Sequence, residues 1–196
     1  MDLLIGTYTE GTDALGIYGV VVSNERSPQA VALDIPVRNP SFLATHPSLP
    51  ILYLVEELSA GEGGGLVSAL SWNGVGFSRL SSQSSLGEDP CHLSISPDGQ
   101  LLAAANYSSG SVVVFKLDDD GRIHGEPVII EHQAEFDSRG GEAGRHSERQ
   151  QQAHAHFSQW IAPRNLLVCD LGTDQVHRYD CQGFDRVDEK NTHLPI

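Results

Sequence analysis

Two histidines separated by a single residue, His154 and His156, are the side chains in this sequence best suited to acid–base chemistry. Residues two apart in a β-strand share a face, so both imidazoles are expected to project together from a strand near residue 155. An imidazole titrates near neutral pH and can act as a general base toward water or donate a hydrogen bond to a developing oxyanion. The alternative is that one or both only form structural hydrogen bonds between neighbouring sheets.

Arg149, just before this pair, is the cationic side chain expected to hold an anionic substrate group. A guanidinium can bind such a group through two parallel hydrogen bonds, which a lysine cannot. Arg149 lies in a polar insertion at about residues 133–152, and connections of this length are commonly functional or disordered. The alternative for Arg149 is a salt bridge within the insertion to Glu148 or Glu142.

The elements that must position these side chains repeat along the chain. Residues 40–56 and 90–106 share one pattern. Each segment begins with a proline and an apolar run, continues with a second proline and a second apolar run, and ends on a polar residue. These two copies are offset by 50 positions. A third copy over residues 153–170 is offset from the second by 63 to 64, and the polar insertion accounts for the longer spacing. A repeat of this length predicts a repeat architecture.

Short apolar runs separated by turn pairs such as Asp120-Gly121 predict β-hairpins, and no apolar stripe of helical length appears. Four-stranded units of about forty to fifty residues are typical of β-propeller blades. The sequence therefore predicts an all-β fold of four-stranded antiparallel blades, with about 3.5 to 4 blades present. The first blade is expected to lack its innermost strand, and the open blade faces to favour self-association. The expected boundaries are blade 1 at about 1–38, blade 2 at about 39–88, blade 3 at about 89–135 and blade 4 at about 153–196.

His92 and Asp170 occupy repeated positions in these predicted blades. His92 aligns with Phe42 and Ala155 in the inner strand, so a polar side chain stands where another blade has an aromatic one. Asp170 ends the second strand, where the earlier copies also have a polar residue. We predict that both contact a substrate. The alternative for both is that they satisfy backbone groups and fix turns between blades.

Composition narrows the classes of partner and compartment. Apolar residues make up 39% of the chain and charged residues 19%, which is typical of a globular protein. A net charge of −14 argues against nucleic acid and anionic lipid as partners, and an anionic substrate would need locally placed cations. The three cysteines are odd in number and lack CxxC spacing, so we expect reduced thiols in a cytoplasmic protein. No apolar run approaches the roughly 18 residues of a membrane span.

Several motifs occur in the order in which they stand in a known family. They are Ile5-Gly6-Thr7-Tyr8-Thr9, Asn39-Pro40-Ser41, Asp89-Pro90-Cys91-His92, Ala105-Asn106-Tyr107-Ser108-Ser109-Gly110-Ser111, Glu148-Arg149-Gln150 with His154-Ala155-His156, and Asp170-Leu171-Gly172-Thr173-Asp174. On these motifs the chain resembles the seven-bladed propeller lactonases, a family that includes bacterial 6-phosphogluconolactonases of the propeller type and is similar to a fungal muconate lactonising enzyme. The family usually has proline where this chain has Ala153, and its proteins are about twice as long.

The resemblance implies that this chain is the N-terminal half of a seven-bladed propeller and a hydrolase of an anionic sugar lactone, such as 6-phosphogluconolactone. It implies that His154 or His156 assists attack of water on the ring carbonyl and that Arg149 holds the anionic group. It implies no cofactor and no metal, although His154, His156 and Asp170 are of types that bind zinc. The alternatives are a non-catalytic scaffold that binds a partner and a truncated, inactive fragment.

Overall fold

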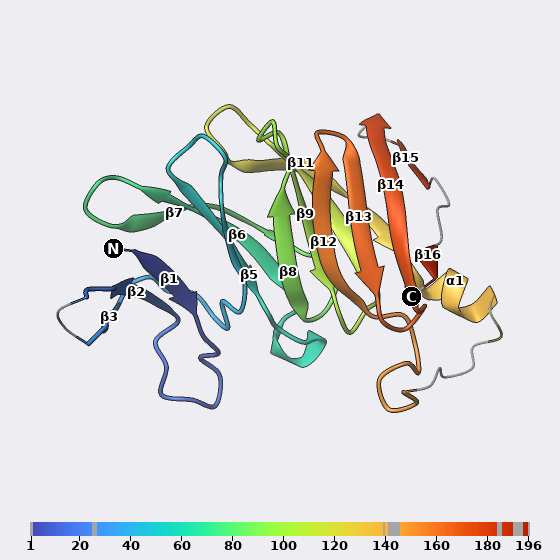
Figure 1. Cartoon of the computed structure of the whole chain (residues 1–196), viewed down its shortest axis with the longest axis horizontal. Helices are drawn as coiled ribbons and strands as arrows, with labels where there is room; N and C mark the ends of the chain where they lie inside the picture. Colours follow the sequence, from blue (N-terminus) through green and yellow to red (C-terminus); the bar gives the residue numbers. More distant parts are fainter. Residues whose placement is uncertain are drawn as a thin grey trace.

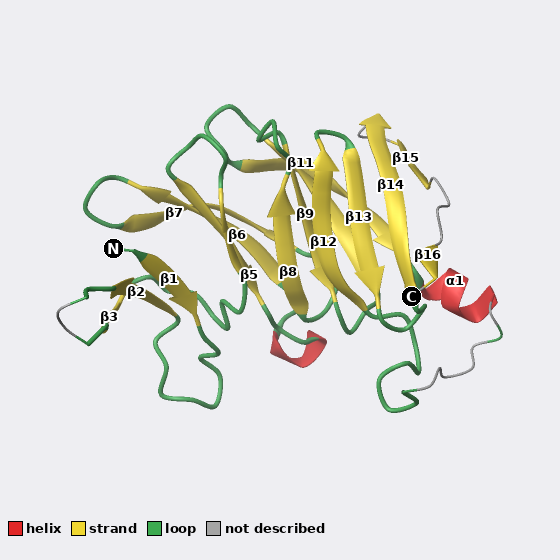
Figure 2. Cartoon of the chain, viewed as in Figure 1, coloured by secondary structure: helices red, strands yellow, loops and turns green. Residues whose placement is uncertain are grey.

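Four antiparallel sheets follow one another along the chain, and within each sheet the strands lie in sequence order (Figures 1 and 2). The computed structural model describes residues 2–24, 27–138, 140, 146–183, 186–189 and 194–195. The first sheet contains β1 (Leu3–Gly6), β2 (Ile17–Val21) and β3 (Gln29–Ala32). The second contains β4 (Leu43–Thr45), β5 (Ile51–Glu56), β6 (Leu66–Trp72) and β7 (Phe77–Ser84).

The last two sheets repeat the arrangement of the second. The third contains β8 (Pro90–Ile95), β9 (Leu101–Asn106), β10 (Ser111–Leu117) and β11 (Ile123–Glu131). The fourth contains β12 (Ala155–Ala162), β13 (Asn165–Asp170), β14 (Gln175–Gly183) and β15 (Arg186–Glu189), and β16 (Leu194–Pro195) also pairs with β14. This is the predicted partial β-propeller, with a first sheet of three strands.

The hydrophobic core lies between the sheets. Every residue of β5 and of β9 is buried, because the second strand of each blade is covered on both faces by neighbouring blades. One apolar cluster joins the second and third sheets around Tyr53 and Phe115, and another joins the third and fourth around Trp160 and Leu166. Continuous apolar runs such as Ile51–Glu56 therefore fold as buried central strands rather than as alternating surface strands.

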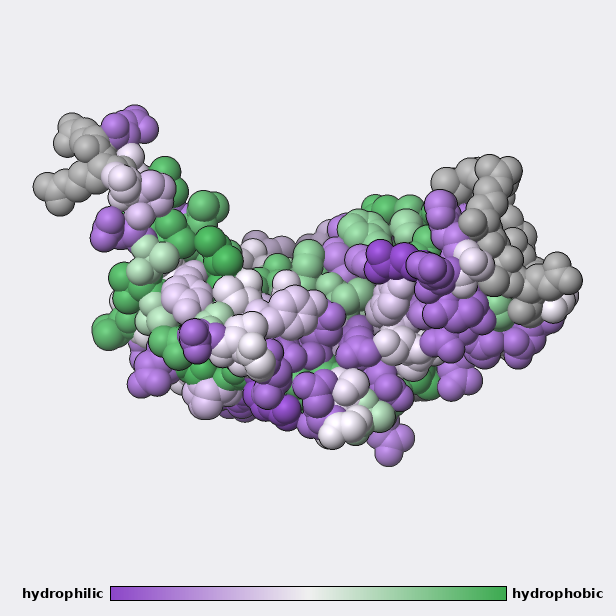
Figure 3. Space-filling model, turned by 90° about the horizontal axis from the view of Figure 1, so that it is seen from below, coloured by the Kyte–Doolittle hydropathy of each residue, from purple (hydrophilic) through white to green (hydrophobic). Residues whose placement is uncertain are grey.

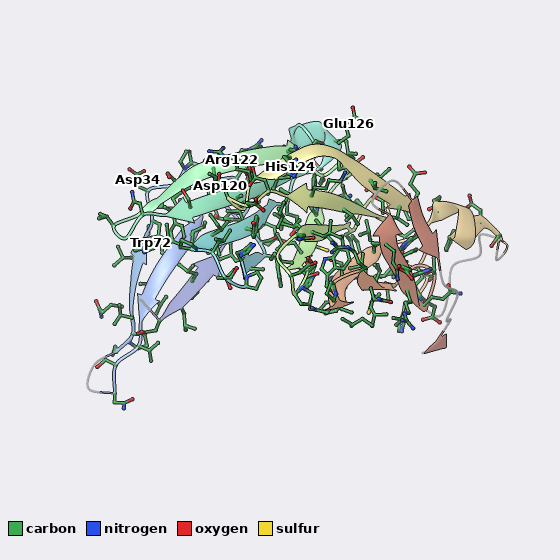
Figure 4. All side chains as sticks on the ribbon, turned by 90° about the horizontal axis from the view of Figure 1, so that it is seen from above. Asp34, Trp72, Asp120, Arg122, His124 and Glu126 are labelled. Carbon is green, nitrogen blue, oxygen red and sulfur yellow. The ribbon has the colours of Figure 1, made fainter. Side chains whose placement is uncertain are left out.

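The sheets together form an arc, seen from one end in Figure 4, with the inner strands β4, β8 and β12 on its concave side. Asp120, Arg122, His124 and Glu126, on β11 and the turn before it, lie on the convex side. The Arg122 guanidinium donates to the carbonyl oxygen of Leu80 at 2.6 Å, which ties β11 to β7. The concave side is thus the one on which side chains from successive blades converge.

The connections contain helical turns that the sequence patterns do not predict. α1 (Gln133–Ser138) begins the polar insertion, and a 3-10 turn (Ala60–Glu62) follows β5. These short segments are the described exceptions to the all-β fold, and six residues are too few to show helical periodicity in the sequence. The Phe136 side chain is buried and holds α1 against the body of the molecule. Among the described residues, no helix is long and apolar enough to cross a membrane.

Candidate active site

The strand registers define which residues of the inner strands are equivalent. Phe42, His92 and Phe157 each lie opposite the residue that precedes the polar end of the second strand. The predicted equivalence of His92 with Ala155 is therefore wrong, since the inner strand of the fourth sheet is offset by 65 residues rather than 63. A β-bulge follows Pro90 in β8 and Ala155 in β12 alike, so the added residues lie before β12, in the polar insertion.

The two predicted catalytic histidines differ in exposure, because only His156 lies in the bulge of β12. His154 immediately precedes β12 and is 5% exposed, whereas His156 falls in the bulge between Ala155 and Phe157 and is exposed. Both rings still meet at Tyr107: His154 stacks on it with ring centroids 4.3 Å apart, and His156 contacts it edge-on at 5.5 Å. The two histidines therefore converge on one aromatic ring, and His156 alone of the pair is open to solvent.

A hydrogen bond defines the tautomer of neutral His154. Its Nδ1 atom lies 3.0 Å from the carbonyl oxygen of Tyr107, and a carbonyl can only accept. The ring proton therefore resides on Nδ1, and Nε2 carries the lone pair. Nε2 is buried and has no hydrogen-bond partner in the described part of the chain. His154 consequently fixes the position of Tyr107 but does not present its basic nitrogen to solvent.

Asp170 lies beneath the surface, which favours the alternative that it satisfies backbone groups rather than contacting a substrate. Its side chain is fully buried, with one oxygen 2.7 Å from Nδ1 of His132. The other oxygen accepts the backbone N–H groups of His154 and Thr173, each at 2.9 Å. Burial by itself raises the pKa of Asp170. The hydrogen bonds from His132, His154 and Thr173 lower the pKa by a larger amount, so it lies below its usual range. Asp170 is a positioning residue.

His132 links Asp170 to a further buried group. Its Nε2 atom lies 2.9 Å from the Tyr179 hydroxyl, and its ring stacks on His177 with centroids 4.3 Å apart. His132 follows β11 directly, whereas Asp170, His177 and Tyr179 belong to the fourth sheet. The network therefore joins the third blade to the fourth beneath His154.

His92 lies on the concave wall between two aromatic rings. Its ring centroid is 4.1 Å from that of Phe42 and 4.3 Å from that of Phe157, so the three equivalent positions form one row of tilted rings across three blades. Burial, together with repulsion from the nearby His156, lowers the pKa of His92 to about 4. His92 also lines a hollow of about 740 Å³ between β1, β4 and β8, on the concave side visible along the upper edge of Figure 3.

Arg149 lies in the exposed turn 146–149 that precedes the histidine pair. Its backbone N–H donates to the carbonyl oxygen of His146 at 2.8 Å, and the two residues border a small surface depression. Glu142, one of its predicted salt-bridge partners, lies outside the described residues. Arg149 forms no ion pair with any residue that is described, Glu148 included.

Sequence patterns did not single out the two residues that organise the site, Tyr107 and His132. Tyr107 stands inside the motif that begins at Ala105, and its place directly after the polar end of β9 was an available signal. His132 had none, because its partners Asp170 and Tyr179 are 38 and 47 residues away. Among the described residues, no three side chains of metal-binding type are grouped to hold an ion. The buried oxygens of Asp170 are also committed to hydrogen bonds.

The fold and this site define a β-propeller that gathers histidines at the ends of its inner strands. The chain belongs to the seven-bladed β-propeller lactonase family, whose model matches residues 2–193.

Relatives named as lactonases are similar over nearly the whole of this chain. The 6-phosphogluconolactonase of Bacillus subtilis is 31% identical over 177 residues, which cover 89% of this chain and 48% of that protein. The 6-phosphogluconolactonase of Formosa agariphila is 28% identical over 181 residues, covering 90% and 49%. The solved periplasmic gluconolactonase of Pseudomonas aeruginosa has a TM-score of 0.79 at 26% identity, covering 98% of this chain and 54% of that one. The chain spans about half the length of the curated relatives it matches.

Proposed function

We propose that this chain contributes the histidine-bearing blades of a lactone hydrolase, and that its substrate is an anionic sugar lactone such as 6-phosphogluconolactone. The single observation that carries the proposal is the exposed His156 ring, set edge-on against Tyr107 in a chain of the lactonase family. The names of the relatives from Bacillus and Formosa support the choice of substrate.

His156 is the general base in this proposal, because its ring is exposed while Nε2 of His154 is buried. It takes a proton from water as the water oxygen attacks the ring carbonyl carbon. The tetrahedral oxyanion then collapses, the ring C–O bond breaks, and protonated His156 returns the proton to the departing ring oxygen. The product is the open hydroxy acid. His154 and Tyr107 hold the His156 ring in place.

Arg149 supports recognition of an anionic group. Its position in an exposed turn, six residues before β12 in the chain and unpaired with any described acid, leaves the guanidinium available to a ligand. Because the chain carries a net charge of −14, the average field opposes a phosphate, and a local cation is required to overcome it. A phosphorylated lactone should therefore depend on Arg149 more strongly than glucono-1,5-lactone does.

The decisive experiment follows acid release from 6-phosphogluconolactone and from glucono-1,5-lactone by the purified chain. We expect His156→Ala to lose about 10²–10⁴-fold in kcat, the usual contribution of a general base. His124→Ala is the matched control, since His124 is an exposed histidine on the convex side. Arg149→Gln should raise KM for the phosphorylated lactone only. Equal rates for wild type and His156→Ala, or no turnover by the wild-type chain, would contradict the proposal.

A second candidate function, self-association through an open blade face, is favoured by the outer surface of the first sheet. Leu3 and Ile5 project from the face that points away from the second sheet, and they are 54% and 46% exposed. Figure 3 shows apolar side chains gathered on the left arm of the molecule, over this sheet. Apolar side chains so grouped on one sheet favour contact with another protein surface. A scaffold role requires only this surface and would survive loss of His156.

We also propose a cytoplasmic location for this chain. Cys91, Cys169 and Cys181 are all free thiols, and burial raises the pKa of Cys91 to about 12 and that of Cys181 to about 11. These thiols therefore stay protonated and unreactive near neutral pH. Fractionation of cells that express the protein tests the location.

A further inference from the structure

His92 accepts a hydrogen bond on Nδ1 from the backbone N–H of Ser158, at 3.3 Å. A backbone N–H can only donate, so Nδ1 must carry a lone pair and the single proton of the neutral ring must reside on Nε2. The bond crosses from β8 to β12, so the packing of two blades sets the tautomer. Neutral His154 has the opposite tautomer, because its Nδ1 donates to Tyr107.

The Nε2 edge of His92 is available to a ligand. No described residue hydrogen-bonds this nitrogen, and it is not among the buried polar atoms that lack a partner. The two faces of the ring are covered by Phe42 from β4 and Phe157 from β12, so only an edge can meet the hollow that His92 lines. The Nε2–H group is thus a donor held in one orientation on the concave wall.

The surroundings of His92 favour its neutral form. The elements packed against it present two phenylalanine rings and the Ser158 backbone, and the titratable group close enough to act on it is His156. A positive charge on His156 repels a second one, and burial between apolar rings disfavours charge as well. A proton on Nδ1 would also displace the Ser158 bond.

We propose that His92 is a neutral hydrogen-bond donor that stabilises the carbonyl oxygen of a bound lactone through Nε2–H as negative charge develops on that oxygen. The inference rests on the proposed function and deepens it by dividing the work between two histidines. His156 removes the proton from water, and His92 keeps its own proton throughout. A neutral imidazole suits this role, because it donates a hydrogen bond without transferring a proton.

The state of His92 can be measured without any activity. In the ¹⁵N-histidine-labelled chain, long-range ¹H–¹⁵N correlation spectra identify the His92 ring by its loss in His92→Phe. Phenylalanine is the matched replacement, because Phe42 and Phe157 fill the equivalent positions and the row of rings is kept. We expect a neutral ring with its proton on Nε2 at pH 5.5. A proton on Nδ1, or a doubly protonated ring at that pH, would overturn the inference.

The ligand experiment separates this inference from the proposed function. D-glucono-1,5-lactam, a carbonyl analogue that resists hydrolysis, is titrated into the labelled chain, and we expect the His92 Nε2 signal to shift on binding. Lactam binding that leaves Nε2 unmoved would overturn the role of His92 and leave the lactonase proposal intact. No lactam binding by the wild-type chain would overturn both.

Kinetics supply a third readout. Removing one oxyanion donor costs about 10²–10³-fold in kcat, so His92→Phe should lose that much with KM little changed. His92→Gln, which restores an N–H donor, should recover part of the loss. Equal kcat for wild type and His92→Phe would contradict the proposal. A lower kcat/KM in His92→Phe that comes only from a higher KM would contradict it as well.

Discussion

Nδ1 of His132 lies 2.7 Å from a carboxylate oxygen of Asp170, and both side chains are almost wholly buried. The pair joins the end of β11 to the end of β13 across the third and fourth blades. Through its other oxygen, Asp170 holds the backbone N–H of His154, two residues before His156. The position of the exposed His156 therefore depends on a pair of side chains buried beneath the surface.

Asp170→Ala should strongly destabilise the chain, because it leaves His132 and two backbone N–H groups without their acceptor. Removing one partner of such a buried pair costs about 3–5 kcal/mol. The free energy of unfolding is measured by urea denaturation. The control is Glu10→Ala, whose partner Arg38 is exposed, and the control should change stability little. Similar losses in both variants would mean that the His132–Asp170 pair adds no more than a surface pair does.

The buried position of His92 should make stability depend on pH. Its folded pKa is about 4, whereas an unfolded histidine titrates near 6.5. Between these values the unfolded chain binds a proton that the folded chain does not, so stability falls as pH is lowered from about 6.5 toward 4. Allowing for partial exposure, the loss at pH 5 is about 1 kcal/mol.

His92→Phe should remove this component of the pH dependence. The free energy of unfolding is compared at pH 7.5 and pH 5.0 for wild type and variant, and the drop should be smaller in the variant. Identical drops would show that His92 titrates normally in the folded chain.

Gly172 should be intolerant of a side chain. A Cβ atom placed on it would lie 1.7 Å from the carbonyl oxygen of Gln152, so Gly172→Ala must push apart the turn after β13 and the segment that leads to His154. Such overpacking typically costs about 1–3 kcal/mol. Gly76→Ala is the control, because nothing lies within 4 Å of its Cβ position. Equal melting temperatures for the two variants would contradict this contact.

Ile5→Lys should weaken any association through the first sheet, since a charge on its open face opposes burial against another surface. Sedimentation velocity over a range of concentrations measures the effect. Val75→Lys is the control, because Val75 is 90% exposed in the turn between β6 and β7. A wild-type chain that stays monomeric at high concentration would count against self-association.

The architecture could be predicted from the sequence because its determinants are local and repeated. The apolar runs that become β5 and β9, together with turn pairs such as Asp120-Gly121, specify hairpins through short-range chemistry. The 50-residue repeat then indicates equivalent sheets. Local sequence also placed His154 and His156 at the start of one strand, with Arg149 shortly before them in the chain.

Tertiary structure alone decided the burial and hydrogen bonding of these side chains. A bulge exposes His156 and leaves His154 buried, although strict alternation would have placed both on one face. Asp170 is turned inward because His132, 38 residues away, reaches it from another blade. The proton of neutral His92 resides on Nε2, because the backbone N–H of Ser158, 66 residues further along the chain, donates to Nδ1. Periodicity within one strand carries no information about contacts between blades, and those contacts set burial, hydrogen bonding and charge.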